Sequence, residues 1–248
     1  MNVPAYLSRI RYEGPLTPNA EVLRSLHRAH MFAVPFENLD ISLGREIICD
    51  EGCFLHKIIN ERRGGFCYEM NGAFGALLTA LGFKVKLLSA RVSGGDGREG
   101  PEFDHLALRI ELEDSLLADV GFGDSFVEPL LLKPDLEQEQ FGRSYRLTSV
   151  GDGLCLEASN DGAWHKQYLF TLQPRQLSEF AGMCYYHQTS PDSPFTRKRV
   201  CSLATPEGRI TVTGDKLIET RNGVRQERAL TEEERIVILW ERFGVRLP

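Results

Sequence analysis

The sequence predicts an α+β protein in which helices come first, an antiparallel β unit follows, and a mixed β/α segment ends the chain. In the first third, apolar residues recur at the spacing of one helix face. After Gly82 the spacing changes to the alternation of apolar and polar residues that is typical of half-buried strands. Near the C-terminus, two hairpin signals are followed by a capping box and an amphipathic run.

Four helices are expected in the first third of the chain. The first covers residues 3–12, and the second begins after Thr17, which precedes a proline suited to the first helical position. The second helix ends near Pro35, because the residue before a proline avoids helical geometry. Asp50 is expected to cap the third helix, and the fourth starts at Cys67, directly after a glycine pair and a phenylalanine.

The middle of the chain is expected to form an antiparallel sheet or a small barrel. A glycine-rich loop at 94–101 separates two strand patterns, and a helix is expected over 176–187. The predicted strands are 83–87, 105–110, 116–120, 145–149, 154–158 and 164–170.

Two hairpins and a helix are expected at the C-terminal end. The first hairpin turns at residues 205–208, and the second turns at Asn222-Gly223, a strong hairpin signal. A capping box at Thr231 then begins the last helix. The strands that flank the two turns are expected at 199–204, 209–213, 216–220 and 224–228.

Charge and composition exclude several classes of protein. The 248 residues carry a net charge of −6, so a general nucleic-acid surface is not expected. No apolar run approaches the ~18 residues of a membrane span, and the N-terminus lacks the charged and apolar regions of a secretory signal. We therefore expect a soluble, cytoplasmic protein that binds neither nucleic acid nor membrane.

The six cysteines are expected to be free thiols, because the expected compartment is reducing. Cys49 and Cys53 form a C-x3-C pair, but zinc would need two further ligands at comparable spacing and none is apparent. No bound metal is therefore expected.

Cys67 stands out among them because it follows Gly64-Gly65 closely and opens an apolar-periodic helix pattern. At a helix N-terminus, unpaired N–H groups and the positive end of the dipole favour a thiolate, which is a nucleophile. The glycines allow close backbone approach, and neighbouring N–H groups suit an oxyanion. The alternative is a buried structural cysteine beside a turn.

His105 and Asp119 are the groups that a nucleophilic cysteine needs. His105 opens a strand directly after the glycine-rich loop. Asp119 lies among apolar strand residues, where burying a carboxylate is costly unless it is paired. Taken alone, each residue is more often structural. Together with Cys67 they are typical of a cysteine–histidine–aspartate transferase or hydrolase, in which the acid fixes the tautomer of the base.

Several short stretches also occur in an order that is characteristic of one enzyme family. They are Val34-Pro35-Phe36-Glu37-Asn38-Leu39, Arg63-Gly64-Gly65-Phe66-Cys67-Tyr68-Glu69-Met70-Asn71, Asp104-His105-Leu106, Asp119-Val120-Gly121-Phe122-Gly123, Ser193-Pro194-Phe195 and Cys201-Ser202-Leu203. With these motifs the sequence resembles the arylamine N-acetyltransferases. The resemblance implies an N-terminal helical bundle, a central antiparallel β-barrel and a C-terminal α/β lid, with a papain-like arrangement of the triad. The corresponding divisions are 1–82, 83–190 and 191–248.

The resemblance further implies a reaction. An acetyl group passes from acetyl-CoA, the co-substrate, to an aromatic amine, hydrazine or arylhydroxylamine through an acetyl-cysteine, in a ping-pong mechanism. Cys67 resembles the family's nucleophile, His105 its base and Asp119 its orienting acid. The partner is thus a small-molecule acceptor, and the oligomeric state is left open.

Other positions take roles from the same resemblance. Phe122 is similar to the aromatic residue that lines the acceptor pocket, and Phe36, with Phe126 and Phe195, is expected to contribute to an apolar wall. Glu37 and Arg63 resemble a structural pair that clamps the Pro-Phe-Glu-Asn loop beneath the cysteine.

The cofactor contacts are expected at two places. Gly94, Gly95 and Gly97 occupy the loop that approaches the CoA pyrophosphate, where backbone N–H groups suit phosphate oxygens. Lys198 lies where the family places a CoA-contacting residue on the lid, and Arg197 and Arg199 flank it; the alternative is a solvated hairpin edge. Several residues of the loop depart from the family pattern. The sequence ends at Pro248, where family members often continue with a tail that shapes the cofactor cleft.

Three other functions remain open at the level of sequence. An amide synthase would release an acyl or polyketide chain by aminolysis from the same site. A papain- or transglutaminase-like hydrolase would use the same triad on another substrate. A binding protein would keep the fold without turnover, although it would not need all three of Cys67, His105 and Asp119.

Overall fold

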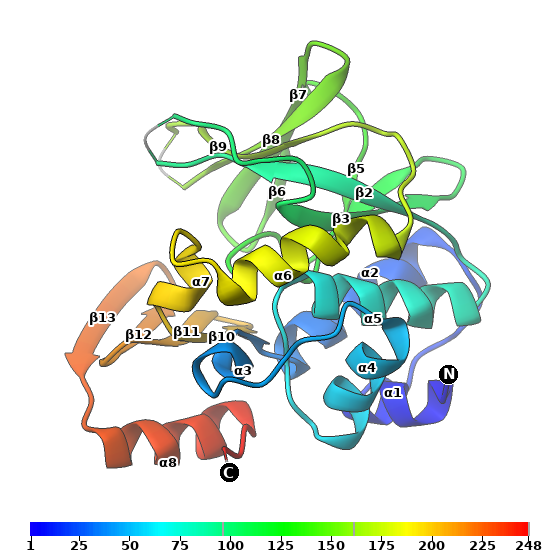
Figure 1. Cartoon of the computed structure of the whole chain (residues 1–248). Helices are drawn as coiled ribbons and strands as arrows, with labels where there is room; N and C mark the ends of the chain where they lie inside the picture. The colour runs from blue at the N-terminus through cyan, green and yellow to red at the C-terminus, as the bar shows by residue number, and fades with distance from the viewer. Residues whose placement is uncertain (96, 161, 248) are drawn as a thin grey trace.

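Short helices make up the N-terminal part of the protein and pack against one buried helix, α5 (Figure 1). The computed structural model describes residues 1–95, 97–160 and 162–247. Asp50 caps α4 as predicted, because its side chain accepts hydrogen bonds from the N–H groups of Gly52 and Cys53. The elements are α1 (Val3–Arg9), α2 (Ala20–Ala33), α3 (Leu39–Ser42), α4 (Glu51–Leu55), the π-helical turn η1 (His56–Asn60) and α5 (Cys67–Ala80).

The start of α2 differs from the prediction. Asn19 caps this helix, since its side chain accepts the Val22 N–H at 2.9 Å. Asparagine ranks above threonine as an N-cap, and Pro18 lies before the helix instead of inside it. The prediction that Thr17 is the cap is therefore wrong.

The central part is an antiparallel sheet of eight strands in the order β5-β4-β3-β2-β9-β8-β7-β6. It curls into a nearly closed barrel above the helices in Figure 1. The family resemblance predicted this barrel, whereas strand patterns alone left a sheet and a barrel open. The strands are β2 (Lys84–Val92), β3 (His105–Glu111), β4 (Leu116–Ala118), β5 (Leu130–Leu131), β6 (Gln138–Gln140), β7 (Arg143–Val150), β8 (Gly153–Ser159) and β9 (His165–Phe170).

Two glutamine side chains join the edge strands of the barrel. The Gln138 amide accepts the Leu131 N–H at 2.7 Å and donates to the Leu131 carbonyl at 3.1 Å. The Gln140 amide accepts the N–H groups of Val127 and Glu128 and donates to the Glu128 carbonyl. Each side chain satisfies backbone groups that a further strand would otherwise pair, so the edge is not left open.

The C-terminal part holds a second antiparallel sheet in the order β1-β10-β11-β12-β13. Its first strand, β1 (Phe36–Glu37), comes from the N-terminal part and pairs Glu37 with Cys201. A two-residue strand after a proline has no periodicity, so the sequence did not predict it. The other elements are η2 (Leu177–Phe180), α6 (Ala181–Thr189), α7 (Pro194–Arg197), β10 (Val200–Thr205), β11 (Gly208–Thr213), β12 (Lys216–Arg221), β13 (Val224–Ala229) and α8 (Glu232–Phe243).

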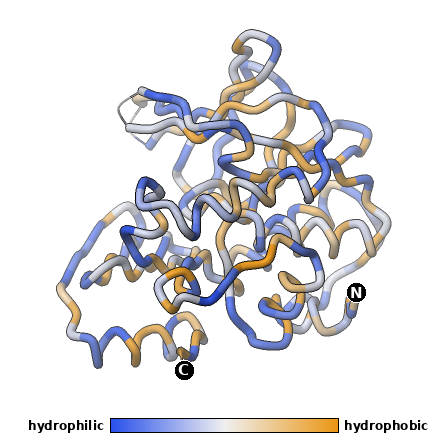
Figure 2. The backbone as a smooth tube through the Cα atoms, in the orientation of Figure 1, coloured by the Kyte–Doolittle hydropathy of each residue, from blue (hydrophilic) through white to orange (hydrophobic). Residues whose placement is uncertain are grey.

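Helix α6 lies between the barrel and the helical part in Figure 1, and three apolar clusters hold these layers together. The largest joins the helices to β3 and β4, the second fills the barrel, and the third lies between the second sheet and α8. Helix α8 carries both hydrophobic and hydrophilic residues in Figure 2, as its amphipathic pattern predicted, and the predicted capping box at Thr231 begins it. The divisions at residues 82 and 190 stay predictions.

Two further observations concern the described residues. Within 1–95, 97–160 and 162–247, none of the helices has the length and apolar character that a bilayer crossing requires. Asp96 of the predicted cofactor loop and the terminal Pro248 lie outside the described residues.

Candidate active site

Cys67 is the first residue of α5 and is 4% exposed. The glycines before it are required by close packing: a Cβ on Gly64 would lie 1.7 Å from the Pro35 carbonyl oxygen, and one on Gly65 would lie 2.5 Å from the Glu69 Cβ. The Glu69 side chain accepts the Phe66 N–H at 3.1 Å and so closes the first turn. The thiol therefore lies at the positive end of a rigidly held helix, where the dipole favours its anion.

His105 begins β3 and connects the thiol to a carboxylate. Its Nε2 lies 2.7 Å from Asp119 Oδ2, and the ring lines the same cavity as Cys67. Because Nε2 is occupied by Asp119, Nδ1 is the nitrogen left for the thiol. Burial lowers the pKa of His105, but the charges and hydrogen bonds of Asp119 and Cys67 outweigh it and raise this pKa to about 10. The arrangement suits an imidazolium beside a thiolate.

Asp119 lies just past the end of β4 and is fully buried. Its Oδ1 accepts hydrogen bonds from Asn71 Nδ2 at 2.8 Å and from the Gly121 N–H at 2.9 Å, while the Tyr168 hydroxyl donates to Oδ2 at 3.0 Å. Burial raises the pKa of this carboxyl, yet His105, Asn71 and the Gly121 N–H lower it below its ordinary value. The carboxylate is thus held ionised and in one orientation.

The backbone of Asp119 is held by a residue whose function the sequence did not reveal. The Asp119 N–H donates to His27 Nε2 at 3.1 Å, and His27 Nδ1 donates to the Val127 carbonyl at 2.7 Å. Burial is the main cause that lowers the pKa of His27 to about 4, so the ring is neutral at pH 7. The helical spacing of His27 and His30 gave no signal of this contact, because its partner comes from the distant barrel.

A cavity of about 460 Å³ opens onto the thiol. The Phe122 ring packs edge-on against His105 with 5.2 Å between centroids, and Phe36 and Phe195 line the cavity with it. Phe126 does not line it; this ring is buried in the barrel against His27 and Tyr145. The lining residues are Phe36, Cys67, Val92, Gly94, Arg98, Glu99, Gly100, Asp104, His105, Gly121, Phe122, His187, Pro194 and Phe195.

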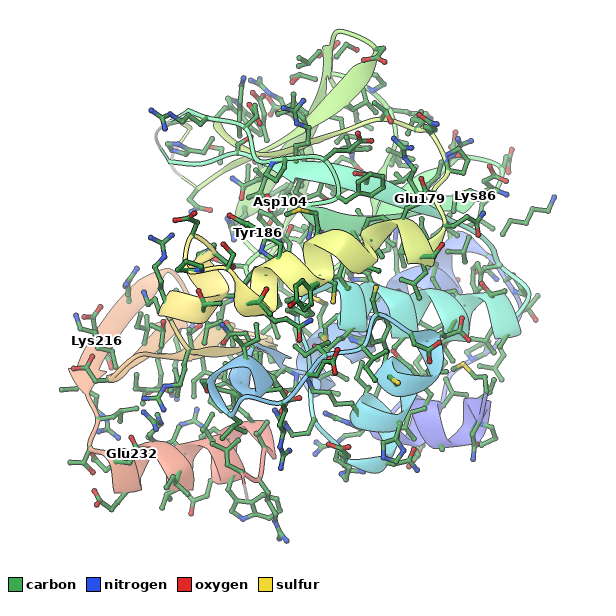
Figure 3. The ribbon with its side chains drawn as sticks, in the orientation of Figure 1. Lys86, Asp104, Glu179, Tyr186, Lys216 and Glu232 are labelled. Atoms are coloured by element: carbon green, nitrogen blue, oxygen red, sulfur yellow. The ribbon has the colours of Figure 1, made fainter. Side chains whose placement is uncertain are left out.

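His187 lines the same cavity from α6 and was not predicted as a site residue. Its Nε2 lies 3.0 Å from Asp104 Oδ1, and its Nδ1 lies 3.2 Å from Ser193 Oγ. Figure 3 labels Asp104 and Tyr186 where the barrel meets α6. Since Ser193 also accepts the Phe195 N–H at 3.2 Å, these contacts fix the loop that presents Phe195 to the cavity.

The residues predicted to contact CoA lie in different surroundings. Gly94 lines the cavity, whereas Gly95 and Gly97 are exposed and do not line it. Lys198 is exposed at the end of α7, and its carbonyl accepts a hydrogen bond from Asn38 at 2.8 Å. The flanking Arg197 donates to carbonyls of its own loop, and Arg199 lines a different cavity, beside α8.

A cluster of charges lies buried beneath α5. Arg63 Nε donates to Glu37 Oε1 at 2.9 Å, and Lys57 Nζ lies 2.7 Å from Asp40 and 2.8 Å from Glu69. Burial raises the pKa of Glu69 to about 7, although Lys57 opposes this shift. Glu37 and Arg63 were predicted as a pair, whereas the other three residues were not. The cluster joins the Pro-Phe-Glu-Asn loop to the helix that carries Cys67.

The described ranges contain no group of three or more His, Cys, Asp or Glu side chains placed to hold a metal ion. His27 and His30, which share a helix face, each bond elsewhere: His30 Nδ1 lies 3.1 Å from the Tyr6 hydroxyl.

Comparison with known proteins gives consistent matches. A family model described as N-acetyltransferase matches residues 19–248. An arylamine N-acetyltransferase of Escherichia coli K12 is 34% identical over 97% of this chain and 87% of its own length. An arylamine N-acetyltransferase isozyme of the Gallus gallus pineal gland is 34% identical over 100% and 95% of the two chains. The solved structure of Mycobacterium marinum arylamine N-acetyltransferase in complex with CoA superposes with a TM-score of 0.93 at 31% identity, covering 98% of this chain and 93% of that one.

Proposed function

Because the chain belongs to the arylamine N-acetyltransferase family, we propose that Cys67, His105 and Asp119 carry out its acetyl transfer. The enzyme transfers an acetyl group from acetyl-CoA to an aromatic amine. One observation carries the assignment of residues: His105 Nε2 lies 2.7 Å from Asp119 Oδ2, while the same ring and Cys67, at the start of α5, line one cavity.

In the first half-reaction the Cys67 thiolate attacks the carbonyl carbon of the thioester. The carbonyl oxygen becomes an oxyanion, for which backbone N–H groups at the start of α5 are suited donors. The carbon–sulfur bond to CoA then breaks, and the imidazolium of His105 gives its proton to the departing CoA sulfur. The products are acetyl-Cys67, free CoA and a neutral His105.

In the second half-reaction the amine nitrogen attacks the acetyl carbon on Cys67. His105 takes one proton from the nitrogen, and the bond to sulfur breaks, so the imidazolium and the thiolate are restored. An aromatic amine is neutral and nucleophilic at pH 7, which suits attack inside a buried site. Asp119 keeps Nδ1 of His105 directed at the reacting atoms in both halves.

Different residues of the cavity are suited to the acceptor and to CoA. Phe122, Phe36 and Phe195 provide an apolar wall for the aromatic acceptor. Gly94, at the start of the glycine-rich loop, lines the cavity, and we assign this loop to the pyrophosphate of CoA. The N–H groups of Gly94 and Gly97 donate to the carbonyls of Arg98 and Gly94 within the loop, so they are not the donors to that pyrophosphate in this conformation. We assign Gly95, Gly97 and Lys198, which are exposed outside the cavity, to the part of CoA that extends beyond it.

The six free cysteines support an enzyme that works in a reducing compartment, and we infer that this compartment is the cytoplasm. We further propose that the acceptor is an aromatic amine, a hydrazine or an arylhydroxylamine.

Intact-mass measurement after mixing with acetyl-CoA tests the assignment. A gain of one acetyl group is expected, and Cys67→Ala should abolish it. Addition of an aromatic amine should discharge the acetyl-enzyme and release the acetylated amine. No gain of mass would reject acetyl transfer through Cys67. Discharge by water at the same rate without amine would instead favour a hydrolase, and charging only by longer acyl thioesters would favour an amide synthase.

A further inference from the structure

We propose that His187 determines which acceptors the enzyme favours, because it positions the Phe195 ring in the active-site cavity. His187 lies on α6 and Phe195 on α7, and both side chains line the cavity that opens onto Cys67. The inference rests on the proposed function, in which Phe195 belongs to the apolar wall for the aromatic acceptor. His187 is a positioning residue here and takes no part in the transfer of protons or of the acetyl group.

The His187 ring contacts the Phe195 ring directly. Their centroids are 5.2 Å apart and their planes meet at 85°, which is an edge-to-face contact. The Phe66 ring makes a second contact of this kind with Phe195, with centroids 5.8 Å apart and an angle of 86°. Edge-to-face geometry is a preferred arrangement of aromatic rings, so these two neighbours limit how the Phe195 ring can turn. Phe66 is fully buried, whereas His187 shares the cavity with Phe195.

Contacts at both ring nitrogens hold His187 in place. Its Nε2 lies 3.0 Å from Oδ1 of Asp104, the residue directly before β3 of the barrel. Its Nδ1 lies 3.2 Å from Oγ of the buried Ser193. Figure 3 labels Asp104 at the barrel and Tyr186, the neighbour of His187, on α6. Because both nitrogens have a partner, the ring is held in one orientation and can support Phe195.

Ser193 connects His187 to the main chain of Phe195. The Ser193 hydroxyl donates to the His187 carbonyl at 3.0 Å and accepts the Phe195 N–H at 3.2 Å. The Asn38 amide holds the other side of this residue, since it donates to the Phe195 carbonyl at 3.0 Å. Ser193 is fully buried and is not among the residues that line the cavity. A change at Ser193 can therefore move Phe195 without touching a substrate.

The base His105 is held by contacts that do not involve His187. The Tyr68 hydroxyl, on α5, donates to the Phe103 carbonyl at 2.7 Å and lies 3.2 Å from the Asp104 carbonyl. His105 itself pairs with Ala90 in the barrel, and its ring bonds to Asp119. Replacing His187 should therefore disturb the wall that receives the acceptor ring and leave the reacting groups in place. The expected result is a loss that depends on the acceptor.

The test compares two nucleophiles on the acetylated full-length enzyme. 4-Methoxyaniline carries a ring that can lie against Phe195, whereas hydrazine carries none. In His187→Leu, discharge by 4-methoxyaniline should slow about tenfold, while discharge by hydrazine and charging by acetyl-CoA should stay within about twofold of the unaltered enzyme. Intact mass recorded at set times measures all three rates. Ser193→Ala should show the same selective loss, because it removes the link between His187 and the Phe195 main chain.

Two further variants separate this role from a general loss of structure. Ser190→Ala is the matched control, because Ser190 lies in the same loop but its hydroxyl accepts the Asp192 N–H at 3.2 Å, and it should leave all three rates unchanged. Phe195→Leu should reproduce the selective loss. Adding His187→Leu to Phe195→Leu should slow discharge little further, because the two residues act through one contact.

Discharge of His187→Leu by 4-methoxyaniline at the unaltered rate would overturn the inference. Losses of equal size with both nucleophiles would overturn it as well, since they would show that His187 only supports the fold. Failure of the unaltered enzyme to take up an acetyl group would instead reject the proposed function, and the inference with it.

Discussion

The His27 ring accepts the backbone N–H of Asp119 at 3.1 Å and donates to the Val127 carbonyl at 2.7 Å. One neutral imidazole on α2 thus joins the segment that carries the Asp119 carboxylate to the loop after it. The ring takes no part in the proposed chemistry, since it contacts the main chain of Asp119 and not its carboxylate. Its role is to hold the carboxylate that orients His105.

Replacing His27 by leucine should lower activity through misplacement of Asp119. We expect a loss of about 1–3 kcal/mol in the free energy of unfolding, because two buried backbone groups lose their partner. We also expect a fall of roughly tenfold or more in the rate of Cys67 acetylation. His30→Leu is the matched control, since His30 is equally buried on α2 but bonds to Tyr6. The acetylation rate is measured by quenching the reaction at set times and recording the intact mass. Equal effects of both variants on this rate would contradict the assigned role of His27.

Asp119→Asn should impair the enzyme far more than Tyr168→Phe. The amide cannot hold His105 in the required tautomer, and a loss of about 10⁴-fold in kcat is expected for such a change. Tyr168→Phe removes one donor to the same carboxylate oxygen, which is worth about 1.5–3 kcal/mol at most. The measurement is the rate of Cys67 acetylation by acetyl-CoA, followed by intact-mass spectrometry. Equal rates in Asp119→Asn and Tyr168→Phe would contradict the orienting role of Asp119.

The dependence of stability on pH should reveal the pairing of His105 with Asp119. The pKa of His105 is raised from 6.5 to about 10, so the folded state holds this proton more tightly than the unfolded state. The resulting stabilisation is fully present below pH 6.5 and is lost as pH rises through about 10, at up to about 1.4 kcal/mol per pH unit. Urea unfolding at several pH values should show a shallower decline in Asp119→Asn. An unchanged slope in that variant would mean that other groups cause the decline.

Glu37→Gln should destabilise the protein strongly. It leaves the buried Arg63 guanidinium, whose side chain is 3% exposed, without its main counter-charge, and a cost of roughly 3–5 kcal/mol is expected. Glu128→Gln is the control, because its pair with Arg28 is exposed and should contribute less than about 1 kcal/mol. The measurement is the midpoint of urea unfolding. Similar midpoints for the two variants would show that the buried cluster does not support the fold.

Gly121→Ala should slow the chemistry strongly. A Cβ there would lie 2.8 Å from the Cys67 Cα and 2.7 Å from Asn71 Nδ2, so the nucleophile and the support of Asp119 must both shift. A displacement of this size is expected to slow the acetylation of Cys67 about 100-fold. Gly75→Ala on α5 is the control, because its Cβ would meet nothing closer than 3.5 Å. Retention of normal acetylation by Gly121→Ala would reject the tight packing that we describe.

Much of the architecture follows from local patterns. Asp50 caps α4, the strand patterns place β3, β7, β8 and β9 within two residues, and the Asn222-Gly223 turn forms its hairpin, whereas β2 runs to Val92 and not to 87. These features depend on neighbours in the sequence, so periodicity and turn chemistry were sufficient to predict them. Thr17 and Asn19 are both residue types that cap helices, and the predicted start of α2 was wrong because Asn19 is the cap.

The sequence by itself determined that a cysteine follows two glycines at the start of a helix, that a histidine begins a strand, and that an aspartate lies at the end of another. Only the tertiary structure decided which side chains support them. His27, Asn71 and Tyr168 reach Asp119 from α2, α5 and β9, and β1 crosses from the helical part to the second sheet. No local pattern encodes these contacts, because a buried carboxylate takes its hydrogen-bond donors from whichever elements the fold brings next to it.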